Sequence, residues 1–362
     1  MRIRLLADDL TGAMDTAVRL VPLTGAIPVL WRSVEAAASE AGSMAYDLGT
    51  RELGAARAGQ RATEAASLLA GADIAYLKCD SLLRGWAAEE ITGCLEAGAF
   101  DHCVIAPAFP AQRRLTRQGR QWAASLGGED WRLVGPALVD QLMAQGLAVS
   151  SRQPGEDAPA GVSLWDAETD VDLRRIVLAA RALPGRVLWC GTAGLAEALA
   201  GAPPQHIGTV QAPLLALVGS DHPVTARQLA EVAEWHCVLA PHDTEVHDTL
   251  ADRLLVRRAV VVSVALPEAS DRRGAAARIA EAFKGIVSAL PQPATLFATG
   301  GETLRGICDA LGANVLTVEG EVDTGIPVSR MRDGRWVGTT VISKSGAFGD
   351  PKLLGRLISS AL

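Results

Sequence analysis

The sequence predicts an α/β protein of two domains, each a largely parallel sheet flanked by helices, with an interdomain cleft. Short apolar runs alternate with segments of helical periodicity along the whole chain. The apolar runs are continuous rather than alternating, which is typical of strands buried on both faces. The chain has 362 residues, more than a single hydrophobic core usually supports, so two domains are expected.

In the first half, six apolar runs are predicted to be strands, and helical patterns lie between them at 53–69 and 86–95. The runs are RIRLLA (2–7), AIPVLW (26–31), SMAYDL (43–48), DIAYLK (73–78), HCVIA (102–106) and RVLWC (186–190).

A second series of strands and helices follows from residue 213 onward. Its predicted strands are PLLALVG (213–219), RAVVVSVAL (258–266), ATLFATGG (294–301), NVLTVEG (314–320) and TTVISKSG (339–346), and its predicted helices lie at 225–234, 271–290 and 302–311.

The boundary between the domains is predicted within GAPPQHIGTVQAP (201–213), where proline and glycine interrupt the periodicity. This placement gives domains at 1–205 and 206–362. The segment SSRQPGEDAPAG (150–161) lacks apolar periodicity and is predicted to be a surface loop.

Composition narrows the class of protein. Hydrophobic residues make up 49% of the chain and charged residues 21%, as in ordinary globular proteins, and the net charge of −7 argues against nucleic acid or an anionic membrane as a partner. The first apolar run is interrupted early by Asp8 and Asp9, so we expect no export signal and a cytoplasmic location. The six cysteines show no C-x-x-C spacing and are expected to be reduced core residues.

Charged and hydroxyl side chains follow several strands of the first domain. In open α/β sheets, ligands bind at the carboxyl ends of the strands. Carboxylates that face arginine and lysine in one crevice suit a small hydroxylated acid, and an aspartate beside its hydroxyl could accept the proton. Taken singly, these residues could equally be helix caps and turns. The set is Asp8, Asp9, Thr50, Arg51, Lys78, Asp80, Ser81, Arg84 and the stretch PAFPAQRRLTRQGR.

In the second domain, three predicted strands end in glycine-containing turns: LVGSDHPVT, FATGGETL and SKSGAFGD. Glycine lets backbone N–H groups approach phosphate oxygens, and a following helix adds its positive end. None of the turns matches G-x-x-x-x-G-K-[ST] or G-x-G-x-x-G, so each alone is also compatible with a tight structural turn.

Two other patterns carry little weight. His236, His242 and His247 lie near Asp243, Glu245 and Asp248, but their spacing fits no compact metal-binding pair, and a surface loop with a helix start is the preferred interpretation. Ser220 lacks a G-x-S-x-G context, which leaves a hydrolase nucleophile unsupported.

A series of sequence blocks, in order over nearly the whole chain, resembles the ATP-dependent four-carbon acid sugar kinases. The blocks are ADDLTGAMDTA, GTRE, YLKCDSLLRG, APAFPAQRRLTRQG, GTAGLAEALA, GSDHPVTARQ, TGGET, GEVDTGIP and KSGAFGD.

The resemblance implies an N-terminal domain that binds the acid and a C-terminal domain that binds ATP. It implies phosphorylation of a terminal hydroxyl of threonate, erythronate, a 3-oxo-tetronate or a related acid. By motif, the implied contacts with the acid are Asp8 or Asp9, Arg51, Lys78, Cys79, Asp80 and Ser81, and those with ATP are Ser220, Gly300, Gly301, Glu302, Thr303 and Gly346.

Three residues in two of the blocks depart from the family pattern. Leu82 stands where threonine is common, and Asp221-His222 stand where small residues are usual. These differences bear on the choice of substrate more than on the reaction.

The resulting hypothesis places Asp9 and Asp80 as catalytic residues, one of the aspartates orienting or deprotonating the hydroxyl, with ATP and Mg²⁺ as cofactors. Arg51 and Lys78 would hold the substrate carboxylate, and Arg84 either the carboxylate or the transferring phosphoryl group. A homo-oligomer is possible. The alternatives are a non-catalytic or differently specific sugar-acid or nucleotide-binding protein of the same fold, and a dehydrogenase, for which no G-x-G-x-x-G follows the first strand.

Overall fold

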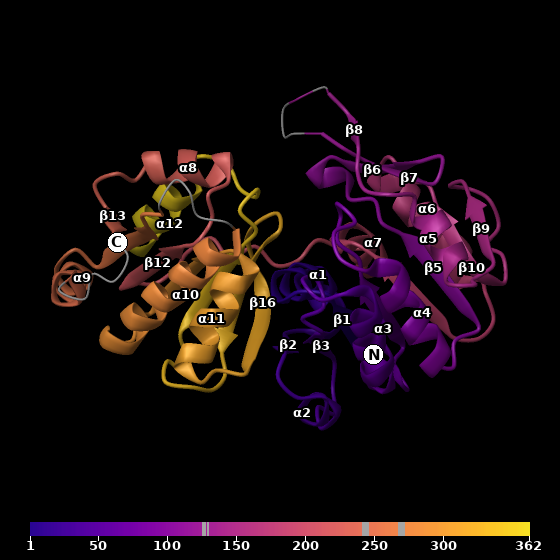
Figure 1. Ribbon diagram of the computed structural model, residues 1–362, viewed down its shortest axis with the longest axis horizontal. Helices are drawn as coiled ribbons and strands as arrows, with labels where there is room; N and C mark the ends of the chain where they lie inside the picture. Colours follow the sequence, from indigo (N-terminus) through magenta and orange to yellow (C-terminus); the bar gives the residue numbers. More distant parts are fainter. Residues whose placement is uncertain (125–127, 129, 241–245, 267–271) are drawn as a thin grey trace. The chain divides into compact units, whose positions relative to one another are not determined.

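The computed structural model describes residues 1–124, 128, 130–240, 246–266 and 272–362. The chain folds into two compact units, Met1–Pro204 and Gln205–Leu362, each built around its own sheet (Figure 1). The predicted α/β class with mostly parallel sheets is confirmed.

The sheet of the first unit is parallel in every pair of its strands. Its strands are hydrophobic because both faces are covered, and β1 and β4 are buried at every position. The spatial order is β2 (Ile27–Leu30), β3 (Met44–Asp47), β1 (Ile3–Ala7), β4 (Ile74–Lys78), β11 (Val187–Gly191), β5 (His102–Ala106), β10 (Gly161–Trp165) and β9 (Val149–Arg152).

Helices of the first unit pack in two groups. One group is α1 (Leu10–Thr24), α7 (Ala193–Ala200) and α6 (Asp170–Arg181); the other is α3 (Ala55–Ala65), α4 (Ala87–Ala97) and α5 (Leu138–Ala144). Short α2 (Val34–Ala38) links β2 to β3. The chain leaves β1 toward β2 and β3 and then crosses over to β4, so the strand order reverses beside β1, which is where ligands bind in such sheets.

A small antiparallel sheet formed by β6 (Arg114–Arg117), β7 (Arg120–Ala123) and β8 (Arg132–Leu133) follows β5. The turn between β6 and β7 has positive φ at Gln118 (51°) and Gly119 (67°), as hairpin turns of type I′ require. Both N–H groups donate to the Asp166 carboxylate, at 2.6 and 2.9 Å. The second half of the polar stretch PAFPAQRRLTRQGR, from Arg114 on, is therefore part of a hairpin, which the sequence interpretation did not predict.

The sheet of the second unit begins with the same strand order as the first. Parallel strands β13 (His236–Leu239), β14 (Ala259–Val264), β12 (Leu214–Val218), β15 (Thr295–Thr299) and β18 (Thr340–Lys344) are followed by β17 (Ile326–Met331), antiparallel to both its neighbours, and β16 (Val315–Asp323). The helices are α8 (Pro223–Ala230), α9 (Val246–Val256), α10 (Arg272–Ala289), α11 (Gly301–Leu311) and α12 (Leu353–Ala361).

The core of the second unit lies between this sheet and its helices. Phe297 at the centre of β15 is fully buried, and Leu354 and Ile358 of α12 pack in the same cluster. Each such side chain contributes about 2 kcal/mol by leaving water.

Three further sequence expectations can be compared with the structure. Segment 150–161 is only partly a loop, because Val149–Arg152 forms the edge strand β9 beside β10, which begins at Gly161. Five of the six cysteines are buried, as expected of core residues. Among the described residues, no helix combines the length and hydrophobicity needed to cross a bilayer.

Candidate functional site

The strand ends of the first unit lie side by side. Ala7 of β1 is in register with Asp47 of β3 and with Lys78 of β4. The residues that follow these strands therefore meet at one edge of the sheet, at the point where the strand order reverses. The structure brings together Asp8, Asp9, Arg51, Lys78, Asp80 and Arg84, as the sequence predicted.

Arg51 is the centre of this strand-end cluster. Its Nε and Nη2 donate to the two oxygens of Asp8 at 2.6 and 2.9 Å, and its Nη1 donates to Asp9 Oδ2 at 2.6 Å. Its Nη2 also lies 3.4 Å from Asp80 Oδ1. Burial lowers the pKa of Arg51, but the three carboxylates outweigh burial and raise it. All three guanidinium nitrogens of Arg51 are therefore hydrogen-bonded to aspartates, which leaves few N–H groups for a ligand.

A second arginine holds Asp80. Arg84 Nε and Nη2 each donate to an Asp80 oxygen at 2.8 Å, and the backbone N–H groups of Leu82 and Arg84 donate to Oδ2 at 3.1 Å. Burial raises the pKa of Asp80, but the hydrogen bonds from Arg84 and the charge of Arg51 hold it well below its ordinary range. A carboxylate so stabilised is a weak proton acceptor.

Asp9 is the most accessible of the three aspartates. Its side chain is 21% exposed, compared with 3% for Asp8 and 6% for Asp80. Asp9 also caps α1, because its Oδ1 accepts the N–H of Gly12 at 2.8 Å. Asp9 is therefore both the N-cap of α1 and an accessible carboxylate at the candidate ligand site.

Lys78 acts on the cluster through its charge, which opposes the effect of burial and lowers the pKa of Asp8 and Asp80, but it makes no direct contact with their carboxylates. Within the described part of the chain, its Nζ has neither an ion pair within 4.0 Å nor a hydrogen bond, although Lys78 is only 4% exposed. Gly12 makes room for it, since a Cβ at that position would lie 3.3 Å from Nζ and 2.5 Å from Asp9 Oδ1. Lys78 is thus better placed than Arg51 to receive an added anion.

Asp15 is a candidate that the sequence interpretation missed. It lies on α1, is 6% exposed, and its Oδ1 has no hydrogen-bond partner among the described residues. Burial raises its pKa to about 6, while Arg19 and Lys78 limit the rise. The available sequence signal was a carboxylate within a mostly apolar helix, four residues before Arg19.

Glu90 of α4 is a second buried carboxyl near the cluster. It accepts a hydrogen bond from Thr50 Oγ1 at 2.5 Å. Burial first, then the charge of Asp8, raises the pKa of Glu90 to about 8.

Cys79 and Ser81, two predicted substrate contacts, are placed differently from Lys78 and Asp80. Cys79 is 2% exposed, and burial raises the pKa of its thiol. Side chains alternate along an extended chain, so Cys79 points away from the face shared by its neighbours Lys78 and Asp80. The carbonyl of Ser81 accepts a hydrogen bond from Gln121 Nε2 at 3.0 Å, which joins this loop to the β6–β7 hairpin.

In the second unit, three glycine-containing turns also meet at one edge. Val218 of β12 is in register with Thr299 of β15, and Thr299 with Lys344 of β18. Gly300 has φ of 101°, and its N–H donates to the Lys344 carbonyl at 3.0 Å. The helix α11 begins directly after it, at Gly301.

Two of these glycines allow very close packing. A Cβ on Gly219 would lie 2.1 Å from Thr303 Oγ1, and a Cβ on Gly346 would lie 2.1 Å from Ser220 Oγ. The edge is therefore lined by backbone and small hydroxyl side chains, which suits phosphate oxygens. Glu302 is the exception, an acidic side chain in the first turn of α11.

No metal centre is built by the protein in the described ranges, where no three His, Cys, Asp or Glu side chains are placed to hold an ion. His236 lies on the edge strand β13 and its Nε2 is 2.8 Å from Ser263 Oγ, while His247 lies on α9. His242, Asp243 and Glu245 lie outside the described residues.

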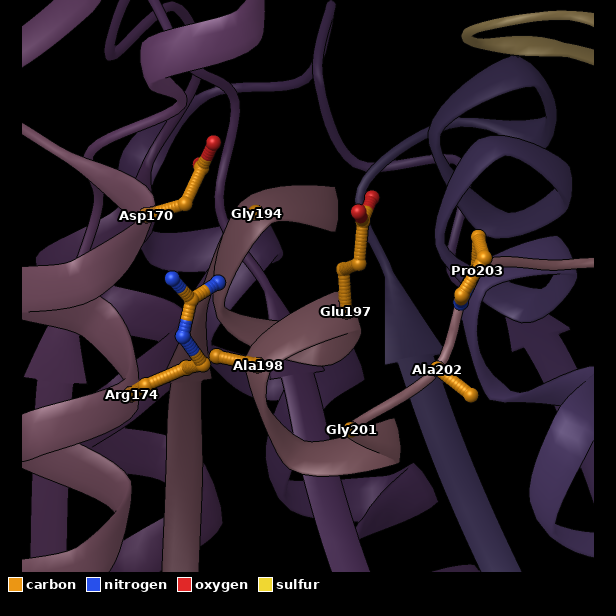
Figure 2. A pocket seen from close by; sticks show the side chains of 8 residues that line it. All are labelled: Asp170, Arg174, Gly194, Glu197, Ala198, Gly201, Ala202 and Pro203. Atoms are coloured by element: carbon orange, nitrogen blue, oxygen red, sulfur yellow. The ribbon is translucent and has the colours of Figure 1, made fainter.

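A cavity of about 120 Å³ on the first unit is lined by none of the residues of the strand-end cluster. Figure 2 shows the side chains of Asp170, Arg174 and Glu197 around it, with Gly201 and Pro203 at its rim. Glu197 accepts a hydrogen bond from Arg19 Nη1 at 3.1 Å. The cavity is too small for a sugar acid and a nucleotide together.

Comparisons with known proteins agree with this division of chemistry. Residues 3–145 match the family model described as a sugar-binding N-terminal domain, and residues 215–354 match the model described as a nucleotide-binding C-terminal domain. These two models define the class, a protein with a sugar-binding half and a nucleotide-binding half.

Full-length relatives give the family. The chain is 31% identical to a D-threonate kinase of Cupriavidus necator over 97% of this chain and 95% of that protein. It is 29% identical to a D-threonate kinase of Bordetella bronchiseptica over 98% and 96%. The chain therefore belongs to the four-carbon acid sugar kinase family, as the sequence blocks indicated.

Solved structures support the fold. A protein of Salmonella typhimurium LT2 superposes with a TM-score of 0.76 at 20% identity, over 98% of both chains. A Haemophilus influenzae protein of the family DUF1537 superposes with a TM-score of 0.71 at 18% identity, also over 98% of both chains.

Proposed function

We propose that this protein is an ATP-dependent kinase that phosphorylates a terminal hydroxyl of a four-carbon sugar acid, with D-threonate as the first candidate. The observation that carries the proposal is the presence of two complementary strand-end sites. One is a cluster of aspartates and cations in 1–204, and the other is a glycine-lined edge in 205–362. The relatives named D-threonate kinase narrow the substrate class.

In the acid-binding site, Lys78 takes the substrate carboxylate, because its ammonium has no partner among the described residues. Arg51 is a positioning residue that holds Asp8, Asp9 and Asp80 in place. Asp9 is the favoured acceptor of the hydroxyl proton, since it is the most exposed aspartate and Asp80 is held ionised by Arg84.

Arg84 lies at the periphery of the acid-binding site. Its side chain is 51% exposed, and its Nη1 makes no hydrogen bond with the described residues. Arg84 could therefore bind the transferring phosphoryl group while its Nε and Nη2 remain on Asp80.

In the nucleotide site, the turns at Gly219-Ser220, Gly300 to Thr303 and Ser345-Gly346 receive the phosphates of ATP. Backbone N–H groups are the donors, so the absence of Cβ atoms at the glycines allows close approach. Glu302 is the least suited of the predicted contacts, because its charge repels phosphate, and a role toward the ribose or the metal fits it better.

Mg²⁺ would enter with the nucleotide. The described residues form no protein-built metal site, and Mg²⁺ commonly keeps its waters while binding substrate phosphates and one or two carboxylates. When bound, it would neutralise charge on the phosphates. A cytoplasmic location follows from the use of ATP. The interdomain cleft and the homo-oligomer stay predictions.

The test is an ATP-consumption assay with Mg²⁺ against both enantiomers of threonate and erythronate, with glycerate as a three-carbon control. We expect turnover on one four-carbon acid, and ³¹P NMR of the product should place the phosphoryl group on the terminal oxygen. Asp9→Asn should lower kcat by about 10² to 10⁴, the usual range for a general base.

Nucleotide binding by the wild-type protein without turnover on any acid would overturn the kinase proposal and favour a non-catalytic binding protein. Turnover on an acid of another chain length would retain the kinase and change its substrate.

A further inference from the structure

Lys344, the last residue of β18, is a buried cation without a carboxylate partner among the described residues. It is 1% exposed. Its Nζ donates to Thr225 Oγ1 at 3.1 Å, to the Ser345 carbonyl at 3.1 Å and to the Gly346 carbonyl at 3.2 Å. All three acceptors are neutral, so the charge of the ammonium is not balanced within the described part of the chain.

These contacts hold the turn that follows β18. The hydroxyl of Thr225 in α8 donates to the Gly346 carbonyl at 2.8 Å. The Gly346 carbonyl therefore accepts hydrogen bonds from both Thr225 and Lys344. Gly346 packs against Ser220, where a Cβ would lie 2.1 Å from Oγ. Lys344 therefore ties the turn after β18 to α8, and this turn packs against Ser220 at the edge where the phosphates are proposed to bind.

A buried charge is costly unless an opposite charge accompanies it. The phosphates of a nucleotide are the charges that this edge would receive, so the ligand can supply what the described residues do not. We propose that Lys344 is a positioning residue of the nucleotide site, which fixes the turn at Ser345 and Gly346 and takes a proton from the buffer onto Nζ when the nucleotide binds. The inference rests on the proposed nucleotide site.

The electrostatic surroundings agree with this role. Burial lowers the pKa of Lys344 to about 7, and no acidic side chain opposes that effect among the described residues. The titratable group facing it from α8 is His222, whose pKa is lowered by burial and then by the charge of Lys344. Asp221 and Arg227 act on His222 in opposite directions.

Nucleotide binding should add a proton to Lys344. In the free protein burial lowers the pKa of Lys344 to about 7, so near pH 8 a fraction of the protein carries neutral Lys344, which has one hydrogen too few for its three acceptors. Nearby phosphate favours the charged form and raises the pKa. Nucleotide binding near pH 8 should therefore be accompanied by net proton uptake, up to the fraction of Lys344 that was neutral before binding.

The experiment is calorimetric titration of ADP with Mg²⁺ into the full-length protein near pH 8, in two buffers of different ionisation enthalpy. ADP is used because it cannot be turned over, and its phosphates are fully ionised at that pH. The difference in observed enthalpy gives the proton uptake directly. This measurement on the wild-type protein needs no variant, so it does not depend on a substitution that might fail to fold.

Two variants identify the group. Lys344→Met should abolish the uptake and weaken ADP binding by about 10- to 100-fold, the range typical for loss of a charged partner. His222→Asn is the matched control, since asparagine also caps helices, and it should leave the uptake unchanged.

The possible failures are distinguishable. If wild-type protein binds ADP without proton uptake, or if uptake persists in Lys344→Met, the inference about Lys344 is wrong while the nucleotide site stands. If no nucleotide binds the folded wild-type protein at all, the proposed function itself is wrong.

Discussion

The two units begin with the same strand order but carry different kinds of residues at the ends of those strands. In the first unit the order is β2-β3-β1-β4, and in the second it is β13-β14-β12-β15, with parallel pairs throughout. The turn after the first strand is Asp8-Asp9 in one unit and Gly219-Ser220 in the other. The shared topology fixes where a ligand binds, and the residue types after the strands decide which ligand it is.

The two edges differ in the groups that they present: charged side chains in the first unit, and mainly backbone groups in the second. The first unit offers fixed charges held by ion pairs, which suits a small acid with several hydroxyls. The second offers glycines, small hydroxyls and one buried lysine, which suits phosphate oxygens. Loss of charge should therefore damage the first unit, whereas added volume should damage the second.

The largest effect is expected from Arg51→Met. This change leaves Asp8, Asp9 and Asp80 without their shared cation, and breaking a buried ion pair by removing one partner costs about 3 to 5 kcal/mol. Denaturant unfolding should show that loss of stability, and kcat/KM for the acid should fall by at least about 10³.

Arg51→Lys is the control for charge alone. It should recover part of the stability but little of the activity, because an ammonium cannot bind Asp8 in two places. A fully active Arg51→Lys enzyme would show that the paired geometry is dispensable.

The next effect is expected from Lys78→Met, which removes the cation proposed to bind the substrate carboxylate. KM for the acid should rise by about 10²-fold, the value of a charge-assisted hydrogen bond, with little change in ADP affinity. Steady-state kinetics and ADP calorimetry on the same preparation would measure both. Equal weakening of both ligands would contradict the division between the units.

A smaller effect is expected from Gly346→Ala, which adds one methyl group against Ser220 and displaces the turn. We expect ATP affinity to fall by about 10-fold, or roughly 1.4 kcal/mol, with unchanged acid binding. The double variant Ser220→Ala with Gly346→Ala removes the hydroxyl that clashes and should restore part of the affinity, as a double-mutant cycle would show. Purely additive effects would mean that the contact is unimportant.

The smallest effect concerns Asp15 and is a pH dependence of stability. Its folded pKa of about 6 lies above its usual value, so the native state binds more protons than the unfolded state between about pH 4 and 6. Stability from this group is therefore present at low pH and lost as pH rises through that window, by about 1 to 2 kcal/mol. Relative to Asp15→Asn, the wild-type unfolding free energy should fall over this range, and parallel curves would exclude Asp15 as the cause.

Much of the fold could be predicted from the sequence, because continuous apolar runs such as DIAYLK and HCVIA leave few choices other than buried strands. The edge strands were harder. Val149–Arg152 and His236–Leu239 are polar or half-exposed, so their pairing depends on a neighbour that local pattern does not reveal. The β6–β7 hairpin is fixed by Asp166, which lies 47 residues from Gly119.

The sequence indicated which residues form the candidate site better than it indicated how they contact one another. Asp8, Asp9 and Asp80 were visible as carboxylates at strand ends, but their sharing of Arg51 depends on register between three strands. In the sequence, Lys78 and Arg51 were equal candidates for holding the substrate carboxylate. Only the hydrogen bonds show that Arg51 already binds aspartates. Asp15 gave a weak signal because its importance comes from burial.

The contacts of Arg51 also bear on how the first unit folds. Its guanidinium joins residues that follow β1, β3 and β4, so it can pair with all three aspartates only when these strands are correctly aligned. A slip of one residue would turn Asp8 to the opposite face of the sheet and leave buried charges unpaired. The same ion pairs thus penalise misaligned strands, so they favour the correct fold of the first unit whether or not a ligand is bound.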